Sequence, residues 1–526
     1  MKFCSNDLIV LRSKYLLYLV ALLLAPLGIL LYSDYDFISS DTAEILYHVK
    51  EINSGIIPYR DSFTHHYLGF LLPLVLIDRF IPLDGHSLWI VAVLYNFITA
   101  IGVALCVSEI LPQRYANLAL LLGVSLGWIP EWQGVIFNVQ TMTLPFLIFY
   151  IWAQVDFLKN GNGSSLYLGC FLAGALITFD QRLVPAAMVI LAALLMRGVW
   201  PAKRETVIAL VSFLSLPAVL FTWLILNGAL NDFVFQTLLF PLIYRNAGNK
   251  QAAAWPFKLL LFALKTAPFL ILLAALGLAV LIKKERKTGL LLSINLAALV
   301  LYLLIGGAGA PNYLMILVPL LLVLCVAGIE GVYSFSRRAG VLVTGLLLLL
   351  GFSVYLAPLQ YYRATGKWRY QADERTFKET AEFIEEQTAP GVKILVWGYQ
   401  PQIYLYSNRF SSFKDMGLIT VTGTSSAGVA VNREGIVPEM LKEFNKMLSE
   451  QPPAIIVIYK PHAKRCGGFP KGCLKNYLDY AKYPEFSYFR CKLENSYRMV
   501  KEVEHEEDSA YVYKRIKGEE HGECKF

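Results

Sequence analysis

Residues 288–330 read TGLLLSINLAALVLYLLIGGAGAPNYLMILVPLLLVLCVAGIE, with no charged side chain before Glu330. The Gly- and Pro-rich stretch around 306–311 divides them into two apolar runs, 288–307 and 311–330. The hydrocarbon core of a bilayer requires ~20 apolar residues of helix. This stretch therefore predicts two neighbouring membrane spans.

Similar runs extend through the first two thirds of the chain. They lie near 15–32, 87–109, 115–130, 139–158, 165–179, 183–197, 204–227, 257–282 and 339–357. The first run lacks a small-residue cleavage site before the acidic stretch that follows it, so we interpret it as a retained helix and not as a secretory signal. The pattern predicts a polytopic α-helical membrane protein with about 11 spans.

Charge divides the chain into two parts. Only 16% of the residues are charged, against ~25% in soluble domains, yet residues 358–526 hold 25 of the 47 Lys and Arg and 22 of the 39 Asp and Glu. We therefore predict a transmembrane domain over 1–357 and a soluble domain over 358–526. The net charge of +8 does not indicate nucleic-acid binding, because the basic clusters lie in short loops between apolar runs.

Those loops predict the orientation. Basic residues cluster near 197–204, 283–287 and 337–338, and such loops are typically cytoplasmic. All three fall on one side only if the short run 68–77, which contains Pro73, is an interfacial helix and not a span. The outer loops are then 33–86 and 228–256, and the C-terminal domain is extracytoplasmic. We therefore predict that the protein is integral to the plasma or inner membrane.

The C-terminal part has the pattern of a small α/β domain. Residues 374–387 and 437–448 have helical periodicity, 393–397 and 454–459 are strand candidates, and 497–503 with 510–516 suggest a hairpin. The domain also carries four cysteines, which in an oxidising space could form up to two disulfides in any of three pairings. These are Cys466, Cys473, Cys491 and Cys524.

The first outer loop carries the residues best suited to chemistry. If 41–54 is helical, Asp41, Glu44, His48 and Glu51 share one face, and Gly55 ends the helix. The competing interpretation is that this is a solvated acidic face. Histidines and aromatics lie between the carboxylates in sequence, which makes that interpretation less favourable.

This loop resembles a known family. The pattern Asp41-x-x-Glu-x-x-Tyr47, then Gly55-x-x-Pro-Tyr-Arg-Asp61-x-Phe and a short apolar run, is similar to the first outer loop of C-type integral-membrane glycosyltransferases. It looks most like the polyprenyl-phosphate-dependent members, including protein O-mannosyltransferases and the aminoarabinose transferases that act on lipid A. A second similar stretch begins at Val396 and reads VWGYQPQIYLYSNRF.

The resemblance implies an activity and a site. A sugar would pass from a polyprenyl phosphate to an acceptor hydroxyl of a glycan, lipid or protein on the outer face, by inversion, with Asp41 as the general base and Asp61 as the second candidate. Arg182, Arg60 and Arg245 are candidates to bind the donor phosphate. Glu44, Tyr47, His65 and Trp132 are candidates to line the substrate cavity, although Trp132 could equally be an interfacial aromatic.

The sequence departs from the aminoarabinose-transferase pattern at one point. Where that type has Glu-Lys-Pro-Pro, this chain has Thr64-His65-His66-Tyr67. His65 could replace the lysine, bind a divalent cation together with Asp41 or Asp61, or be an interfacial aromatic. The sequence leaves the metal requirement and the sugar open.

Two other functions compete with the transferase. A transporter or lipid flippase would place ionisable residues within its spans and often shows duplicated halves, but this chain has few charges inside its apolar runs and no visible repeat. A scaffold whose outer domain binds a partner would not require the acidic, Tyr- and His-rich first loop.

Overall fold

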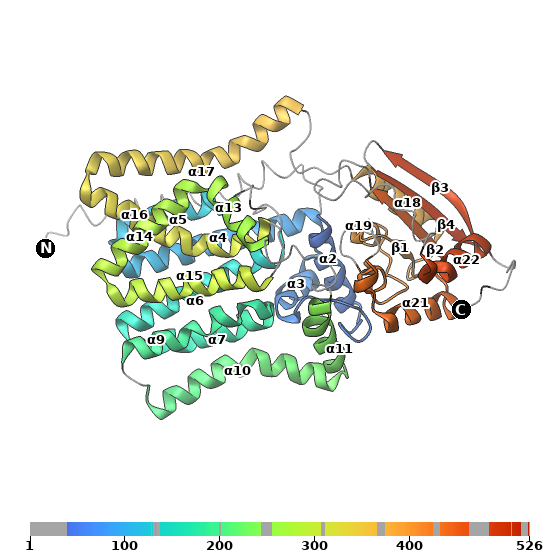
Figure 1. Ribbon diagram of the computed structural model, residues 1–526, viewed down its shortest axis with the longest axis horizontal. Coiled ribbons are helices and arrows are strands. Elements are labelled where there is room, and N and C mark those ends of the chain that lie inside the picture. Colours follow the sequence, from blue (N-terminus) through green and yellow to red (C-terminus); the bar gives the residue numbers. More distant parts are fainter. Residues whose placement is uncertain are drawn as a thin grey trace.

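The computed structural model describes residues 39–127, 129, 132, 137–198, 201–243, 255–306, 311–365, 374–423, 432–461, 483–505, 508–516 and 524. Figure 1 shows a bundle of roughly parallel helices on one side and a smaller domain with a sheet on the other. Helices α2 (Ser40–Asn53), α3 (Leu68–Phe80) and α11 (Leu230–Val234) lie where the two parts meet. The predicted first span at 15–32 lies outside the described residues.

The helices of the bundle follow the predicted apolar runs. They are α4 (Gly85–Ile110), α5 (Gln113–Leu126), α6 (Val139–Asn160), α7 (Gly163–Phe179), α8 (Val184–Ala187), α9 (Val189–Arg197), α10 (Lys203–Leu226), α13 (Trp255–Thr266), α14 (Pro268–Lys284), α15 (Arg286–Gly306), α16 (Val318–Phe335) and α17 (Arg337–Thr365). Within the described residues, 5 helices are long and apolar enough to cross a membrane, or up to 6 if a bent pair counts as one span. The structure thus supports a polytopic membrane protein but does not confirm the predicted count of spans.

Two predicted elements have a different form in the structure. The run 257–282 is not one helix, because α13 and α14 meet at an angle of 99°. Pro268 begins α14, and Ala267 before it has a non-helical backbone, as the residue before a proline commonly does. The predicted loop 228–256 is partly helical, since an apolar helix covers Leu230–Ile243.

Small residues allow the closest helix contact in the bundle. A Cβ on Gly277 of α14 would lie 1.8 Å from the carbonyl oxygen of Leu324 on α16, and one on Gly328 would lie 2.2 Å from that of Leu273. Larger residues could not fit there unless the helices separated. Such close approach of backbones is how helices associate in a membrane, where the hydrophobic effect gives them no preference for each other over lipid.

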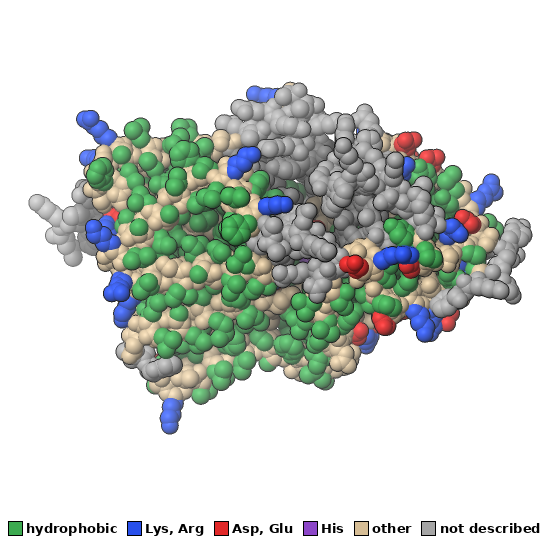
Figure 2. Space-filling view, viewed as in Figure 1, with side chains coloured by type: hydrophobic (Ala, Val, Ile, Leu, Met, Phe, Trp, Pro, Cys, Tyr) green, Lys and Arg blue, Asp and Glu red, His purple; other side chains and the backbone are tan. Residues whose placement is uncertain are grey.

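One end of the bundle collects the predicted basic loops. Lys159 at the end of α6 forms an ion pair with Glu285 between α14 and α15 at 3.0 Å, and Lys284 contacts Glu330 of α16 at 2.7 Å. Arg197, which ends α9, donates to the carbonyl oxygen of Phe157 on α6. Figure 2 shows Lys and Arg side chains at this end, and apolar side chains over much of the bundle's visible surface. The C-terminal domain, which the sequence predicts to be soluble and which is named the soluble domain below, adjoins the opposite end (Figure 1).

Helix α3 does not have the length of a span. It has 13 residues, which is ~20 Å of helix against a hydrocarbon core of ~30 Å. Its first turn is fixed to the bundle, because a Cβ on Gly69 would lie 2.4 Å from the carbonyl oxygen of Thr178 at the end of α7. The loop that precedes α3 is thereby held next to the segment that follows α7.

The soluble domain is built on a mixed four-stranded sheet. The strands β1 (Leu395–Trp397), β2 (Ile455–Pro461), β3 (Tyr497–His505) and β4 (Asp508–Arg515) lie in the order β1-β2-β4-β3. β1 and β2 pair in parallel, and β4 pairs antiparallel with both β2 and β3. These elements confirm the predicted strands and the terminal hairpin, and α18 (Arg375–Gln387) and α21 (Pro438–Glu450) confirm the two predicted helices.

Successive side chains along the inner strands point to opposite faces of the sheet, into two separate cores. Trp397 of β1 packs in one core with Phe444 of α21 and Phe489 of α22 (Ser487–Ser496), whereas Val396 packs in the other with Phe377 of α18. This is the period of two that a strand covered on both faces requires. Cys491 and Cys524 form a disulfide, while Cys466 and Cys473 lie outside the described residues.

Candidate active site

The candidate site is built around helix α2. Ser39 caps its start by accepting from the Thr42 amide at 3.2 Å, and Gly55 follows its end with a φ of 86°, a left-handed conformation that glycine adopts without strain. The predicted helix and its glycine stop are therefore confirmed. One face of α2 packs beneath the soluble domain, through α19 (Pro401–Tyr406).

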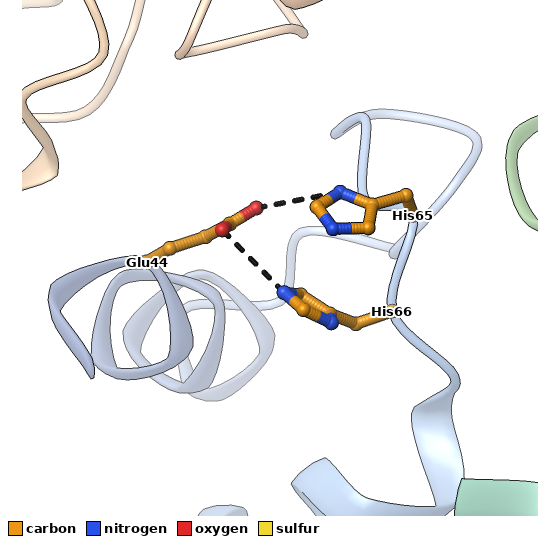
Figure 3. Close-up of side chains that lie close together, drawn as sticks. All are labelled: Glu44, His65 and His66. Carbon is orange, nitrogen blue, oxygen red and sulfur yellow. Dashed lines mark ion pairs between the residues drawn. The ribbon is translucent and has the colours of Figure 1, made fainter. Parts of the chain in front are cut away.

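Glu44 is the centre of the cluster on this face. Its carboxylate lies 3.7 Å from His48 Nε2, 3.8 Å from His65 Nδ1 and 3.4 Å from His66 Nε2. Figure 3 shows the two ring nitrogens of His65 and His66 directed at separate oxygens of this carboxylate. Although burial opposes ionisation, the charge of His66 and the nearby His48 imidazole hold the pKa of Glu44 well below its usual value. Glu44 is therefore an anion in this arrangement.

His48 lies between two carboxylates. Its Nδ1 contacts Glu51 Oε2 at 2.9 Å, and the same Glu51 oxygen accepts from Ser62. Burial opposes protonation, but the neighbouring carboxylates of Glu44 and Glu51 raise the pKa of His48 to about 9. The sequence spacing predicted that these three residues share a face of α2, and the structure confirms it.

The loop that carries His65 and His66 is held from two sides. Gln236 lies in the turn of π-helix that follows α11, and its side chain donates to the carbonyl oxygen of Tyr59 at 2.7 Å and accepts from the Thr64 amide at 2.9 Å. The Tyr59 hydroxyl donates to the carbonyl oxygen of His66 at 2.8 Å. These bonds fix the two histidines against Glu44.

The soluble domain contributes a side chain to the cluster. The hydroxyl of Tyr399, which follows β1, donates to Glu44 Oε2. Nearby, Gln402 donates to Ser40 Oγ at 3.2 Å, and the Phe63 amide donates to the carbonyl oxygen of Lys414 at 2.8 Å. The site is therefore formed by the bundle end and the soluble domain together. Nothing in the sequence indicated that Tyr399 meets Glu44.

Asp41 lies one turn before Glu44 and is exposed to solvent. It is nevertheless closely surrounded by protein atoms. This partial desolvation, together with the negative charge of Glu44, raises the pKa of Asp41, while His66 opposes the shift. The two carboxylates of this turn thus have pKa values displaced in opposite directions, which is a common arrangement of acid–base residues in active sites.

Arg182 approaches the same region from the bundle. It lies in the 3₁₀ turn Gln181–Leu183 after α7, and its positive charge is one of the causes, after burial and the charge of His66, that lower the pKa of His65 to about 4. The guanidinium pairs with Asp180 and lies over the rings of Tyr302 and Tyr313 at 4.9 and 4.8 Å. Its side chain is 19% exposed.

A polar network behind Arg182 was not apparent in the sequence. Tyr302 of α15 donates to Asp180 Oδ2 at 3.2 Å and accepts from Gln140 of α6 at 3.2 Å. Asn312 donates to Gln140 at 3.2 Å. These bonds link three helical segments and set the position of the arginine.

The remaining predicted site residues are placed elsewhere. Arg60 and Asp61 pair with each other on the surface at 2.9 Å, with side chains 45% and 39% exposed, and Arg60 also donates to the carbonyl oxygen of Asn227. The hydrogen bond from Arg60 lowers the pKa of Asp61, which makes Asp61 a weaker base. Arg245 lies outside the described residues.

Tyr47 and Trp132, which the sequence predicts to line the substrate cavity, are both buried in the structure. The Tyr47 hydroxyl accepts from the Ser411 amide at 2.9 Å, and its ring packs against Tyr404 and Phe410 in a core of the soluble domain. Trp132 donates to Thr266 Oγ1 at 2.8 Å, beside the bend between α13 and α14. Both aromatics therefore serve packing, because their hydroxyl and indole groups are already bonded within the protein.

The chain was compared with known proteins at three levels. No family model and no curated protein matches it. Among solved structures it is similar to ArnT from Cupriavidus metallidurans bound to undecaprenyl phosphate, with a TM-score of 0.61 and 13% identity over 97% of this chain and 98% of that one. The apo state of the same protein gives a TM-score of 0.60 and 12% identity over 96% and 98%.

A more distant likeness is to the Archaeoglobus fulgidus oligosaccharyltransferase in complex with Zn and sulfate, with a TM-score of 0.48 and 11% identity over 92% of this chain and 79% of that one. The match to ArnT extends over nearly the whole length of both chains, so it includes the bundle and the soluble domain alike. The chain therefore has the fold of a C-type glycosyltransferase.

Proposed function

We propose that this protein is a membrane glycosyltransferase that moves a sugar from a polyprenyl-phosphate donor to an acceptor hydroxyl. The observation that carries the proposal is the position of Asp41, Glu44 and Arg182 at one end of an apolar bundle. Glu44 lies 3.8 Å from His65, and both the loop of His65 and the turn of Arg182 are bonded to the π-helix that follows α11. In such a fold, ArnT has been solved with undecaprenyl phosphate bound. A lipid-linked phosphate presented at the bundle end would meet both the Asp41 carboxylate and the Arg182 guanidinium.

The chemistry requires three roles. Asp41 takes the proton of the acceptor hydroxyl, whose oxygen attacks the anomeric carbon with inversion. The bond from that carbon to the phosphate oxygen breaks, and the polyprenyl phosphate leaves as a phosphate monoester. Arg182 stabilises the charge that develops on the leaving phosphate. The raised pKa of Asp41 makes it a stronger base than an ordinary aspartate, provided that it is ionised at the working pH.

The transporter alternative gains no support from the described bundle. Its ion pairs, such as Lys159–Glu285 and Lys284–Glu330, lie at the helix ends. Arg182 and Asp180 lie between helices, at the end that faces the soluble domain. A transport pathway usually places such groups near the middle of the membrane.

The function can be tested directly with purified protein. The protein is incubated with a panel of polyprenyl-phosphate sugars, both hexoses and pentoses, and the loss of each donor and release of polyprenyl phosphate are measured. We expect consumption of at least one donor, at a rate abolished by heat denaturation. If folded protein leaves every donor intact, with and without added glycan, lipid and protein acceptors, the proposal is wrong.

We further propose that the site and the soluble domain are extracytoplasmic. The basic loops share the end of the bundle opposite to that domain, and such loops are retained in the cytoplasm. In intact cells, an impermeant maleimide should label Lys446→Cys above the wild-type level but should not label Lys284→Cys. Both side chains are exposed, at 65% and 50%. The opposite labelling pattern would reverse the orientation.

A further inference from the structure

Three imidazoles surround a single buried carboxylate. His65, His66 and Glu44 each offer one ligand atom, and these atoms all lie within 4.8 Å of one another. His48 faces the same carboxylate, with its Nε2 3.7 Å from Glu44 Oε1. The four side chains come from α2 and from the loop before α3, both of which are fixed by the hydrogen bonds described above. Figure 3 shows three of them converging on one small volume.

The second observation is the buried nitrogen of His48. Its Nε2 has no hydrogen-bond partner among the described residues, although the residue is only 2% exposed. Leaving a buried polar atom without a partner is energetically unfavourable. Such an atom therefore commonly marks a missing ligand or ion.

The other nitrogen of His48 explains how Nε2 could serve a metal. Nδ1 lies 2.9 Å from Glu51 Oε2, and Ser62 also donates to that oxygen. A carboxylate that accepts from Nδ1–H fixes the tautomer with its lone pair on Nε2. This carboxylate–histidine pair is the usual outer shell of a metal-binding histidine.

We propose that Glu44, His65 and His66 bind one divalent transition-metal ion, with His48 as the fourth ligand. Imidazole and carboxylate ligands suit Zn²⁺ and its first-row neighbours, whereas Mg²⁺ and Ca²⁺ prefer sites made of oxygen alone. The Glu44 oxygens lie 3.4 Å from His66 Nε2 and 3.8 Å from His65 Nδ1, close to the spacing around a tetrahedral ion with bonds of about 2.0–2.2 Å. The ion would replace the protons that the cluster otherwise holds.

The charge balance of the site gives the ion a role, and this part rests on the proposed function. Arg182 is paired with Asp180, so part of its positive charge is offset before it meets a phosphate. Asp41 and Glu44, one turn apart on α2, add negative charge to the site. A bound dication would offset these carboxylates and attract the anionic donor to the side of Asp41.

The test measures metal binding, not transfer. Purified full-length protein is freed of metal with a chelator and titrated with Zn²⁺, and the bound metal is counted by mass spectrometry after desalting. Co²⁺ is used in parallel, because its visible absorption reports nitrogen and oxygen ligands. The variants are His65→Gln, which is 38% exposed and so perturbs packing little, and Glu51→Gln in the outer shell. His505→Gln, in a surface pair with Glu379, is the matched control.

We expect about one tightly bound Zn²⁺ per chain, unchanged in His505→Gln. Affinity should fall ~10–100-fold in Glu51→Gln and by at least as much in His65→Gln. Size-exclusion chromatography checks that each variant is folded. If the wild-type protein binds no ion, or if folded His65→Gln binds as tightly as wild type, the metal site is excluded. If the protein consumes a donor but binds no metal, the metal site is wrong and the proposed function stands. If it binds metal but consumes no donor, the metal site stands and the proposed function is wrong.

Discussion

Asp41→Asn is expected to lower sugar transfer at least ~10²-fold while leaving folding and donor binding intact. A general base contributes ~10²–10⁴-fold to rate, or about 3–5 kcal/mol of barrier at roughly 1.4 kcal/mol per tenfold. Asparagine has almost the shape of aspartate but cannot accept the proton. Because Asp41 is exposed, its substitution removes no buried contact. Steady-state kinetics with the donor found by the panel would give turnover and donor affinity separately.

Asp61→Asn is the matched control. Asp61 belongs to the same outer loop and was the second candidate from the sequence, but it pairs with Arg60 on the surface. We therefore expect near-normal turnover from Asp61→Asn. Full activity in Asp41→Asn together with loss of activity in Asp61→Asn would reassign the base, and loss in neither would count against the transferase itself.

Much of the soluble domain could be predicted because its signals are local. The short apolar runs at 393–397 and 454–459 and the amphipathic pattern at 374–387 each correspond to an observed element. The register of the hairpin is also local, since Asp508 pairs with His505 across a short turn. Such signals need no knowledge of the rest of the chain.

The site could be predicted only in part. The helical spacing of Glu44, His48 and Glu51 predicted that they lie on one face of a helix, as they do in the structure. The contact of Tyr399 with Glu44 joins residues 355 apart in sequence, and no local pattern encodes it. Arg60 was a reasonable candidate by residue type, but its guanidinium donates to the carboxylate of its immediate neighbour, Asp61.

The aromatics show a different limit. Tyr47 and Trp132 have the residue types of a sugar-binding cavity and equally those of a core, because both kinds of environment favour aromatic side chains with one polar group. Only the packing distinguishes them. The hydrogen bonds to Ser411 and Thr266 show that both polar groups are used internally.

The final prediction concerns Arg182, where the conservative change to lysine is the informative one. Alanine would leave Asp180 buried without its partner, so a loss of activity could reflect misfolding. Lysine keeps the charge but cannot present two N–H groups to a phosphate or lie flat over Tyr302 and Tyr313 in the same way. If Arg182 binds the leaving phosphate, one lost charged hydrogen bond costs about 1.5–3 kcal/mol.

Arg182→Lys should therefore reduce kcat/KM for the donor by ~10–100-fold, and Arg60→Lys, in its exposed pair with Asp61, should change it little. The loss of activity caused by Arg182→Lys should be present in donor hydrolysis as well as in transfer, because the phosphate leaves in both reactions. Equal kinetics for Arg182→Lys and wild type, or a larger loss in Arg60→Lys, would mean that the phosphate binds elsewhere. A defect confined to transfer, with normal donor hydrolysis, would place Arg182 at the acceptor and leave the leaving group to another cation.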